Sequence, residues 1–264
     1  MCPYRRCRKP LYGFTLIELL VVISIIALLI ALLLPAIKRA KAVAVQVACG
    51  SLLANVGVAM YAYAGDQNGF FPRPTGNVGP SNVGIDAGRI LEHDYGLSFP
   101  NGQTCPALLK SDDFSESQFG ELSLARGFDH DWGYRLGYLA ISSLQSGGHD
   151  AASFPAQVPY VSATVEDPPG HNIAADFNFR VWRNWNFWDP GTGSGSIVPH
   201  QGNEEDGRPE GSNNLFQDIS VTWMDESILG PDGEGIDGTF NYDYNPSIAT
   251  LGDRAYYWGV ALYR

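Results

Sequence analysis

The feature that most constrains this chain is an apolar run at residues 16–36, in which Glu18 is the only charged residue. A helix of about 20 apolar residues is long enough to cross the hydrocarbon core of a bilayer. A carboxylate inside such a run costs free energy unless it finds a partner, so Glu18 is by default a candidate functional residue. The run therefore predicts a membrane-spanning helix that carries one functional acid near its N-terminal end.

The charge of the chain differs on the two sides of this run. Residues 1–13 contain no acid and four basic residues, Arg5, Arg6, Arg8 and Lys9, whereas the whole chain holds 28 acidic and 17 basic residues, for a net charge of −11. Positive flanking residues stay in the cytoplasm, so the N-terminus is expected there and the C-terminal part on the other side of the membrane. We expect no direct nucleic-acid binding, because phosphate repels an acidic surface.

The helical pattern continues beyond the apolar run to about residue 64. Apolar residues recur every three to five positions, as one helix face requires: Ala40, Val43, Val47, Leu52, Val56 and Met60. Pro35 is expected to kink or locally melt this helix, because it removes one backbone hydrogen bond. The alternative is a helix that ends at Leu34, followed by a second helix. Residues 65–69 (GDQNG) are expected to end the helix, because Gly and Asn tolerate the left-handed conformation.

Residues 13–41 (GFTLIELLVVISIIALLIALLLPAIKRAK) resemble the N-terminus of type IV prepilins and type II secretion pseudopilins. In that family a membrane aspartyl peptidase cuts after the glycine and methylates the new N-terminal residue. The resemblance implies cleavage between Gly13 and Phe14, N-methylation of Phe14, an assembly contact through Glu18 and a helix kink at Pro35. An ordinary signal anchor with a chance glutamate is the alternative interpretation.

The resemblance also implies an α+β, pilin-like fold, in which a long N-terminal transmembrane helix packs against the small antiparallel β-sheet of a globular head. We expect a cleaved cytoplasmic leader (1–13), a long helix (14–66) that spans the membrane over about 16–36, and an extracytoplasmic head (67–264). The expected location is the bacterial inner membrane. The expected partners are prepilin peptidase, other pilin or pseudopilin subunits, the inner-membrane assembly platform and membrane lipid.

The function implied is that of a subunit of a type IV pilus or a type II secretion pseudopilus. The alternative is a single-pass, membrane-anchored binding protein that does not polymerise. No nucleophile with a convincing base and no His-Glu-x-x-His zinc-protease motif is present in the sequence, so we do not expect an enzyme.

Several segments of the head have their own secondary-structure patterns. Residues 87–95 predict a short helix, and residues 158–165 and 253–264 predict strands. Residues 134–144 fit a strand, a helix or a mixture of the two, and the pattern favours a strand. Residues 173–182 alternate in part, with Ile173 and Asp176 expected on opposite faces of one strand. Residues 200–223 resemble a His-x-x-Gly…Asn-x-Leu-Phe-x-Asp-Gly-x-Val-x-Trp pattern of prepilin-like heads, which fits two strands joined by a turn at residues 217–218. Ile219 stands where that pattern has glycine, which argues against a tight turn with positive φ.

Two further groups of residues are candidates for chemistry in the head. Cys49 and Cys105 would both lie in an oxidising compartment, where they form either a disulfide or two separate buried thiols. Asp232, Glu234 and Asp237 present carboxylates on a glycine-rich loop, as Ca²⁺ requires, and major pseudopilins hold calcium in a similar C-terminal loop. The spacing does not match an EF-hand, so a solvated acidic loop is the alternative.

Overall fold

The computed structural model of this 264-residue chain describes residues 14–73, 82–97, 104–108, 120–121, 134–135, 138–140, 164–176, 178–181, 188–189, 194–195, 198, 200, 207, 209–225, 239–243 and 254–259. The chain divides into two compact units, Met1–Ala44 and Val45–Arg264. The boundary falls inside helix α1 (Leu16–Asp66), so this helix contributes to both units. The second compact unit begins at Val45, within the helix predicted over residues 14–66, and the predicted start of the head at residue 67 stays a prediction.

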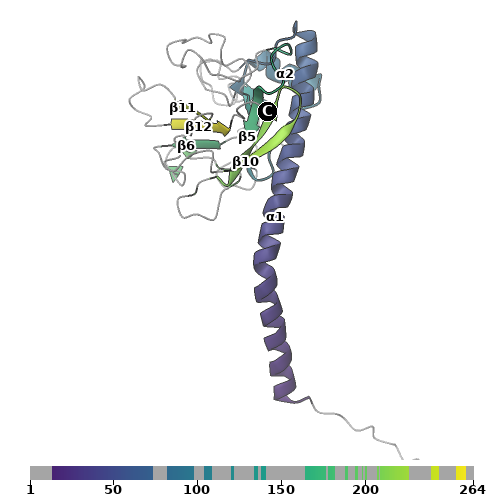
Figure 1. The fold of residues 1–264 in the computed structure, drawn as a ribbon, viewed down its shortest axis with the longest axis vertical. Coiled ribbons are helices and arrows are strands. Elements are labelled where there is room, and N and C mark those ends of the chain that lie inside the picture. The colour runs from purple at the N-terminus through teal and green to yellow at the C-terminus, as the bar shows by residue number, and fades with distance from the viewer. Residues whose placement is uncertain are drawn as a thin grey trace, which may run out of the picture. The chain divides into compact units, whose positions relative to one another are not determined.

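In the first unit, the part of helix α1 that runs up to Ala44 exposes all of its apolar side chains. Every described residue from Phe14 to Ala44 is exposed, and Leu16 reaches 87%. The helix is long and apolar enough to cross a membrane, which supports a membrane anchor. It continues through Pro35 as one element (Figure 1), so the alternative of a helix that ends at Leu34 is wrong. A single proline removes only one hydrogen bond of a long helix.

The C-terminus of α1 is closed by the residues that the sequence indicated. Asn68 and Gly69 both have positive φ, of 54° and 84°. The Gly69 amide donates to the Ala64 carbonyl at 2.8 Å, which is the 6→1 hydrogen bond of a Schellman cap. The predicted stop at GDQNG is therefore confirmed, with Asn68 as the first residue in the left-handed conformation.

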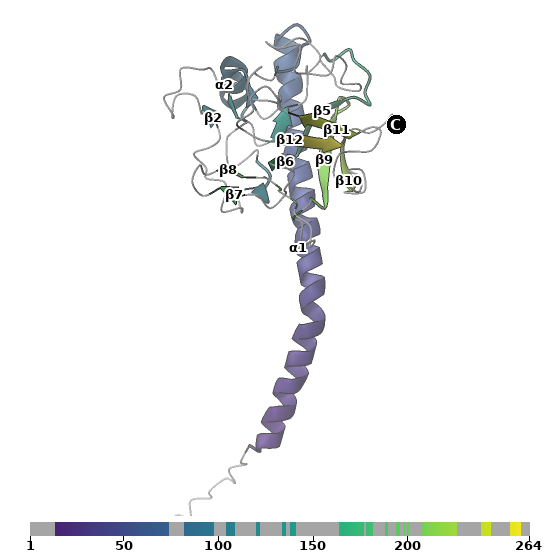
Figure 2. The same cartoon turned by 90° about the vertical axis from the view of Figure 1, so that its left-hand side faces the viewer.

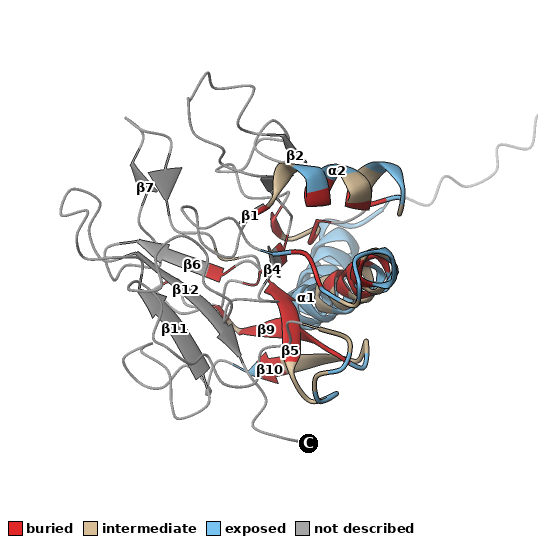
Figure 3. Cartoon of the chain, turned by 90° about the horizontal axis from the view of Figure 1, so that it is seen from above, coloured by how far each residue is buried: buried red, intermediate tan, exposed pale blue. Residues whose placement is uncertain are grey.

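The second unit is built on a four-stranded antiparallel sheet. Its strands are β4 (Tyr138–Ala140), β5 (Asn172–Asp176), β9 (Gly211–Phe216) and β10 (Val221–Asp225), in the order β10-β9-β5-β4. Cys49, Leu53, Val56, Met60 and Ala64 of α1 share one hydrophobic core with Ile173, Ala174, Ala175 and Leu215 of this sheet. Figure 3 shows these buried segments facing one another. The predicted α+β, pilin-like layout is therefore confirmed.

The helix and the sheet approach closely at Gly57. A Cβ placed on Gly57 would lie 3.0 Å from Cδ1 of Leu215, so only glycine fits this contact without a shift.

The predicted β9–β10 hairpin is confirmed, but the doubt about its turn was wrong, because Ile219 does adopt a positive φ of 65°. Its side chain reaches the same glycine, and the Tyr61 hydroxyl of α1 donates to the carbonyl of Gln217 in the turn. These contacts offset the cost of the left-handed conformation, about 1–2 kcal/mol for a residue with a Cβ.

The other described elements of this unit are one helix and several short strands. They are β1 (Asn82–Val83), α2 (Ile85–His93), β2 (Gly120–Glu121), β3 (Tyr134–Arg135), β6 (Asn178–Val181), β7 (Trp188–Asp189), β8 (Ser194–Gly195), β11 (Thr239–Asp243) and β12 (Arg254–Gly259). These strands form antiparallel sheets in the orders β1-β3-β2, β11-β12-β6 and β7-β8. Figure 2 labels α2 and several of these strands. Helix α2 confirms the predicted short helix, and β12 lies in a predicted strand segment. The segment 134–144 does not form one strand, because β3 and β4 belong to different sheets. In the segment 158–165, residues 158–163 lie outside the described residues, and Thr164 forms a bridge with Phe70.

The prediction of one strand over residues 173–182 was wrong. The segment forms two strands in different sheets, since β5 pairs with β4 and β9, whereas β6 pairs with β12. All five residues of β5 are buried, including Asp176, which was expected on the opposite face from Ile173. Alternation of residue types does not show whether both faces of a strand are covered, and here α1 and the side chains around Asp176 cover them.

Candidate functional site

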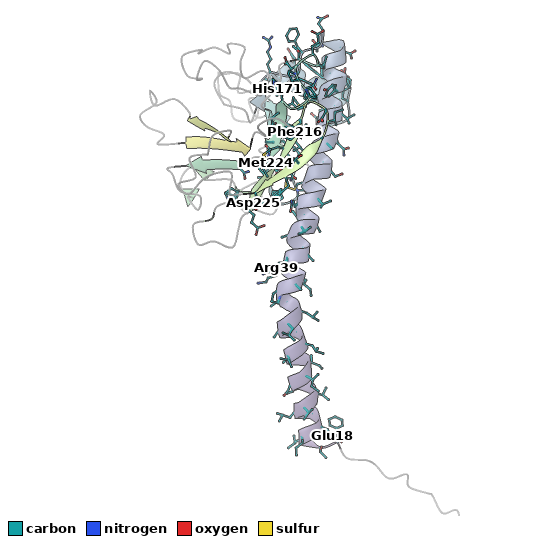
Figure 4. All side chains as sticks on the ribbon, in the orientation of Figure 1. Glu18, Arg39, His171, Phe216, Met224 and Asp225 are labelled. Atoms are coloured by element: carbon teal, nitrogen blue, oxygen red, sulfur yellow. A yellow bond between two sulfur atoms is a disulfide. The ribbon has the colours of Figure 1, made fainter. Side chains whose placement is uncertain are left out.

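Glu18 lies in the first turn of α1 (Figure 4), where it forms reciprocal hydrogen bonds with Thr15. Thr15 donates to Oε2 of Glu18 twice, from its backbone N and from its hydroxyl, each at 2.8 Å. In return, the Glu18 amide donates to the Thr15 hydroxyl oxygen at 3.3 Å. This is a capping box, which satisfies two amides that would otherwise lack partners at the start of a helix.

The capping box holds the Glu18 carboxylate at the very beginning of α1. Phe14, the residue before Thr15, is 71% exposed. A negative charge at this end of a helix also interacts favourably with the helix dipole. The Thr-x-x-Glu spacing is itself a sequence signature of a capping box, so this contact was readable from the sequence but missed. Gly13 lies outside the described residues, and Pro35 lies in the helix interior.

A second constellation lies in the core of the second unit. The structure joins Cys49 of α1 and Cys105 in a disulfide, with an S–S distance of 2.00 Å and a Cα–Cα distance of 4.6 Å. Both residues are fully buried. Of the two alternatives that the sequence left open, the structure has the disulfide rather than two separate thiols.

His200 and Asp176 lie directly beside this disulfide. Nε2 of His200 is 3.4 Å from Sγ of Cys105 and 3.3 Å from Oδ2 of Asp176. The same carboxylate oxygen accepts hydrogen bonds from the backbone N and from Nδ2 of Asn213, at 2.7 and 3.0 Å. The rings of His200 and Trp223 pack in a T-shaped arrangement, with ring centroids 5.1 Å apart. The strands β5, β9 and β10 thus position most of the contacts around the imidazole.

Tyr138 completes the polar surroundings of the disulfide. Its hydroxyl donates to the carbonyl of Cys49 at 3.0 Å, and its side chain is fully buried. Burial, with a smaller contribution from the charge of Asp176, raises the pKa of Tyr138 well above its usual value of 10. The hydroxyl therefore stays protonated and keeps this hydrogen bond at all ordinary pH values.

The sequence singled out His200 as the start of a structural pattern but gave no sign that it contacts Cys105 and Asp176. Those three residues are far apart in the chain, and no local motif links them. The arrangement is not a Cys-His-Asp catalytic relay, because both neighbours contact the same nitrogen, Nε2, whereas a relay uses both ring nitrogens. Asp232, Glu234 and Asp237 lie outside the described residues, so the calcium site stays a prediction.

Comparison with known proteins identifies the N-terminal segment. Residues 11–34 match the prokaryotic N-terminal methylation motif. No curated protein and no solved structure matches the chain. The motif, followed directly by a long apolar helix in an α+β layout, fits a type IV prepilin-like protein. The motif is typical of a structural, pilin type of protein rather than of an enzyme class.

Proposed function

We propose that this chain is a pilin or pseudopilin subunit, processed by prepilin peptidase and assembled into a type IV pilus or a type II secretion pseudopilus. The observation that carries the proposal is the methylation motif at residues 11–34, which runs into a helix whose apolar side chains are all exposed up to Ala44. Such a surface is stable only against lipid or against other apolar helices. Membrane lipid covers it before assembly, and neighbouring subunits cover it in the filament.

Cleavage between Gly13 and Phe14 would place a new amine directly before the capping box. Glu18 then carries a negative charge within one helical turn of that positive charge. Pairing the methylated amine of Phe14 with a carboxylate neutralises two charges that lipid penalises. We propose that the amine comes from a neighbouring subunit, so that each pair fixes the axial register of two helices. The N-terminus faces the cytoplasm and the inner-membrane assembly platform, and the head is extracytoplasmic.

The capping box makes it possible to separate the charge of Glu18 from its structural role. Glu18→Gln keeps an oxygen that accepts the Thr15 hydrogen bonds, because glutamine also serves in a capping box, but it removes the charge. Glu18→Ala removes both the charge and the cap, at a cost of about 0.5–2 kcal/mol for the cap. We expect both variants to insert and to be cleaved, and neither to assemble.

The assay measures assembly as the fraction of processed subunit in sheared, sedimented filaments seen by electron microscopy. Glu166→Gln, which removes an exposed charge from the head, is the matched control and should assemble normally. Normal filaments from Glu18→Gln would refute the charge pairing and leave only the capping role. Processing is checked separately by mass spectrometry, which should show a mature chain that begins at methylated Phe14 and little cleavage in Gly13→Ala. A mature Gly13→Ala chain that begins at Phe14 would refute the cleavage-site assignment.

A further inference from the structure

We propose that Cys49 and Cys105, when they are thiols, form a buried binding site for Zn²⁺ together with His200 and Asp176. The two sulfur atoms and one ring nitrogen of His200 all lie within 4.8 Å of one another, and all three residues are buried. Thiolate and imidazole are the ligands that Zn²⁺ prefers in structural sites. All four residues lie in the second unit, and the proposal does not rest on filament assembly.

The distances around His200 are those of a tetrahedral site. With Zn–N, Zn–O and Zn–S bonds of about 2.0–2.3 Å, the ligand atoms of a tetrahedron stand about 3.3–3.7 Å apart. Nε2 of His200 is 3.4 Å from Sγ of Cys105 and 3.3 Å from Oδ2 of Asp176. The S–S bond of 2.00 Å is too short for an edge of that tetrahedron, and opening that bond is what reduction does.

The orientation of the side chains favours a shared metal over a proton relay. Cys105 and Asp176 converge on one nitrogen, as ligands of a common ion do. Asp176 is fully buried, and its second oxygen, Oδ1, has no hydrogen-bond partner among the described residues. A cation beside Oδ2 would neutralise this buried carboxylate, whose Oδ1 makes no hydrogen bond in the described part of the chain that offsets its burial. The burial of all four side chains excludes water, so the site is of the closed, structural type.

The disulfide and the metal are alternative occupants of this cluster. A dithiol that reduces the bond donates two electrons and two protons, yields two cysteine thiols and becomes a disulfide itself. Zn²⁺ binding then displaces the two thiol protons, which pass to the solvent as the thiolates bind the ion. A newly made chain already has thiols, so it binds Zn²⁺ without any reduction. Later exchange with another disulfide, which accepts the two electrons and becomes a dithiol, forms the Cys49–Cys105 bond and releases the ion.

The test uses the full chain in detergent micelles, reduced with dithiothreitol and then freed of it under nitrogen. Co²⁺ is the spectroscopic probe, and Zn²⁺ is the competitor. The reduced chain should bind one Co²⁺ ion per chain. The bound ion should show thiolate-to-cobalt charge-transfer absorption and the visible absorption bands of tetrahedral Co²⁺, and added Zn²⁺ should abolish both. The oxidised chain should show neither. Equal binding by reduced and oxidised chains would overturn the proposal.

Variants show whether the folded cluster, rather than a pair of thiols, binds the ion. We expect His200→Ala to weaken Zn²⁺ binding by more than about 100-fold and Asp176→Asn by about 10- to 100-fold. His93→Ala, which removes an exposed histidine on α2, is the control and should bind as the wild type does. Unchanged affinity in His200→Ala would overturn the assignment of the imidazole.

X-ray absorption of the Zn²⁺-loaded wild type makes the test independent of how the variants fold. The site requires two sulfur neighbours at about 2.3 Å and two nitrogen or oxygen neighbours at about 2.0–2.1 Å. Four sulfur neighbours would indicate that two chains share the ion, and none would indicate a surface site. Either result would contradict the proposal.

Discussion

Loss of the Cys49–Cys105 disulfide should lower the free energy of unfolding of the second unit by about 4 kcal/mol. The bridge joins residues 56 positions apart, one on α1 and one in the segment 104–108. Closing a loop of that length removes about 14 cal/mol/K of entropy from the unfolded chain, or about 4 kcal/mol at 25 °C. For a unit of this size, such a loss lowers the melting temperature by about 8–16 °C.

The assay is thermal unfolding of the full chain in micelles, followed by near-ultraviolet circular dichroism, which reports the packing of aromatic side chains rather than the membrane helix. A metal chelator is present throughout, so that bound Zn²⁺ does not replace the lost bridge. The oxidised chain is compared with the reduced chain and with the Cys49→Ala/Cys105→Ala double variant. A loss below about 1 kcal/mol in the reduced chain would refute the loop-entropy argument for this bridge.

Two further predictions concern the packing of the second unit and a surface hydrogen bond. Gly211→Ala should lower the free energy of unfolding by at least about 2 kcal/mol, because the added Cβ would lie 2.2 Å from the carbonyl oxygen of Met224. Gly65→Ala, whose added Cβ would have nothing within 4 Å, should leave the free energy of unfolding unchanged or raise it by up to about 1 kcal/mol. Similar melting temperatures of the two variants would contradict this prediction. The Tyr95 hydroxyl donates a hydrogen bond to the Asp66 carboxylate, which raises the pKa of Tyr95 from 10 to about 12. The contribution of this hydrogen bond to the free energy of unfolding is therefore fully present below pH 10 and is lost as the pH rises through 12. In an ultraviolet titration, Tyr95→Phe should remove one tyrosine that ionises near pH 12, and loss of one that ionises near pH 10 would contradict the hydrogen bond.

The sequence predicted those parts of the fold that depend on local pattern. Helix α1 followed from its apolar run and from the recurrence of apolar residues behind it, and its end followed from Asn68 and Gly69. The strand over residues 173–182 was mispredicted, because alternation does not reveal that the segment changes sheets after Asp176. Ile219 was misjudged because its positive φ depends on packing against Gly57, which is a tertiary contact.

The candidate sites divide in the same way. The Thr15–Glu18 capping box is a contact between residues three positions apart, and its spacing is visible in the sequence. The cluster in the head combines Cys105, Asp176 and His200, which only the fold brings together. A pattern of residue types identifies neighbours along a helix or strand, whereas contacts across 24 to 95 positions depend on how the sheet pairs and on where α1 packs.

The most direct test of the central claim is whether neighbouring subunits contact one another through the apolar half of α1. A photoreactive amino acid at Val22, whose side chain is 48% exposed, would be activated in membranes of cells that contain prepilin peptidase and the assembly platform. The account predicts a ladder of crosslinked subunits in the otherwise wild-type chain and single subunits in Glu18→Gln. Single subunits in both the otherwise wild-type chain and Glu18→Gln would contradict assembly and favour a membrane-anchored binding protein. Equal ladders of crosslinked subunits in both chains would contradict the role of the Glu18 charge.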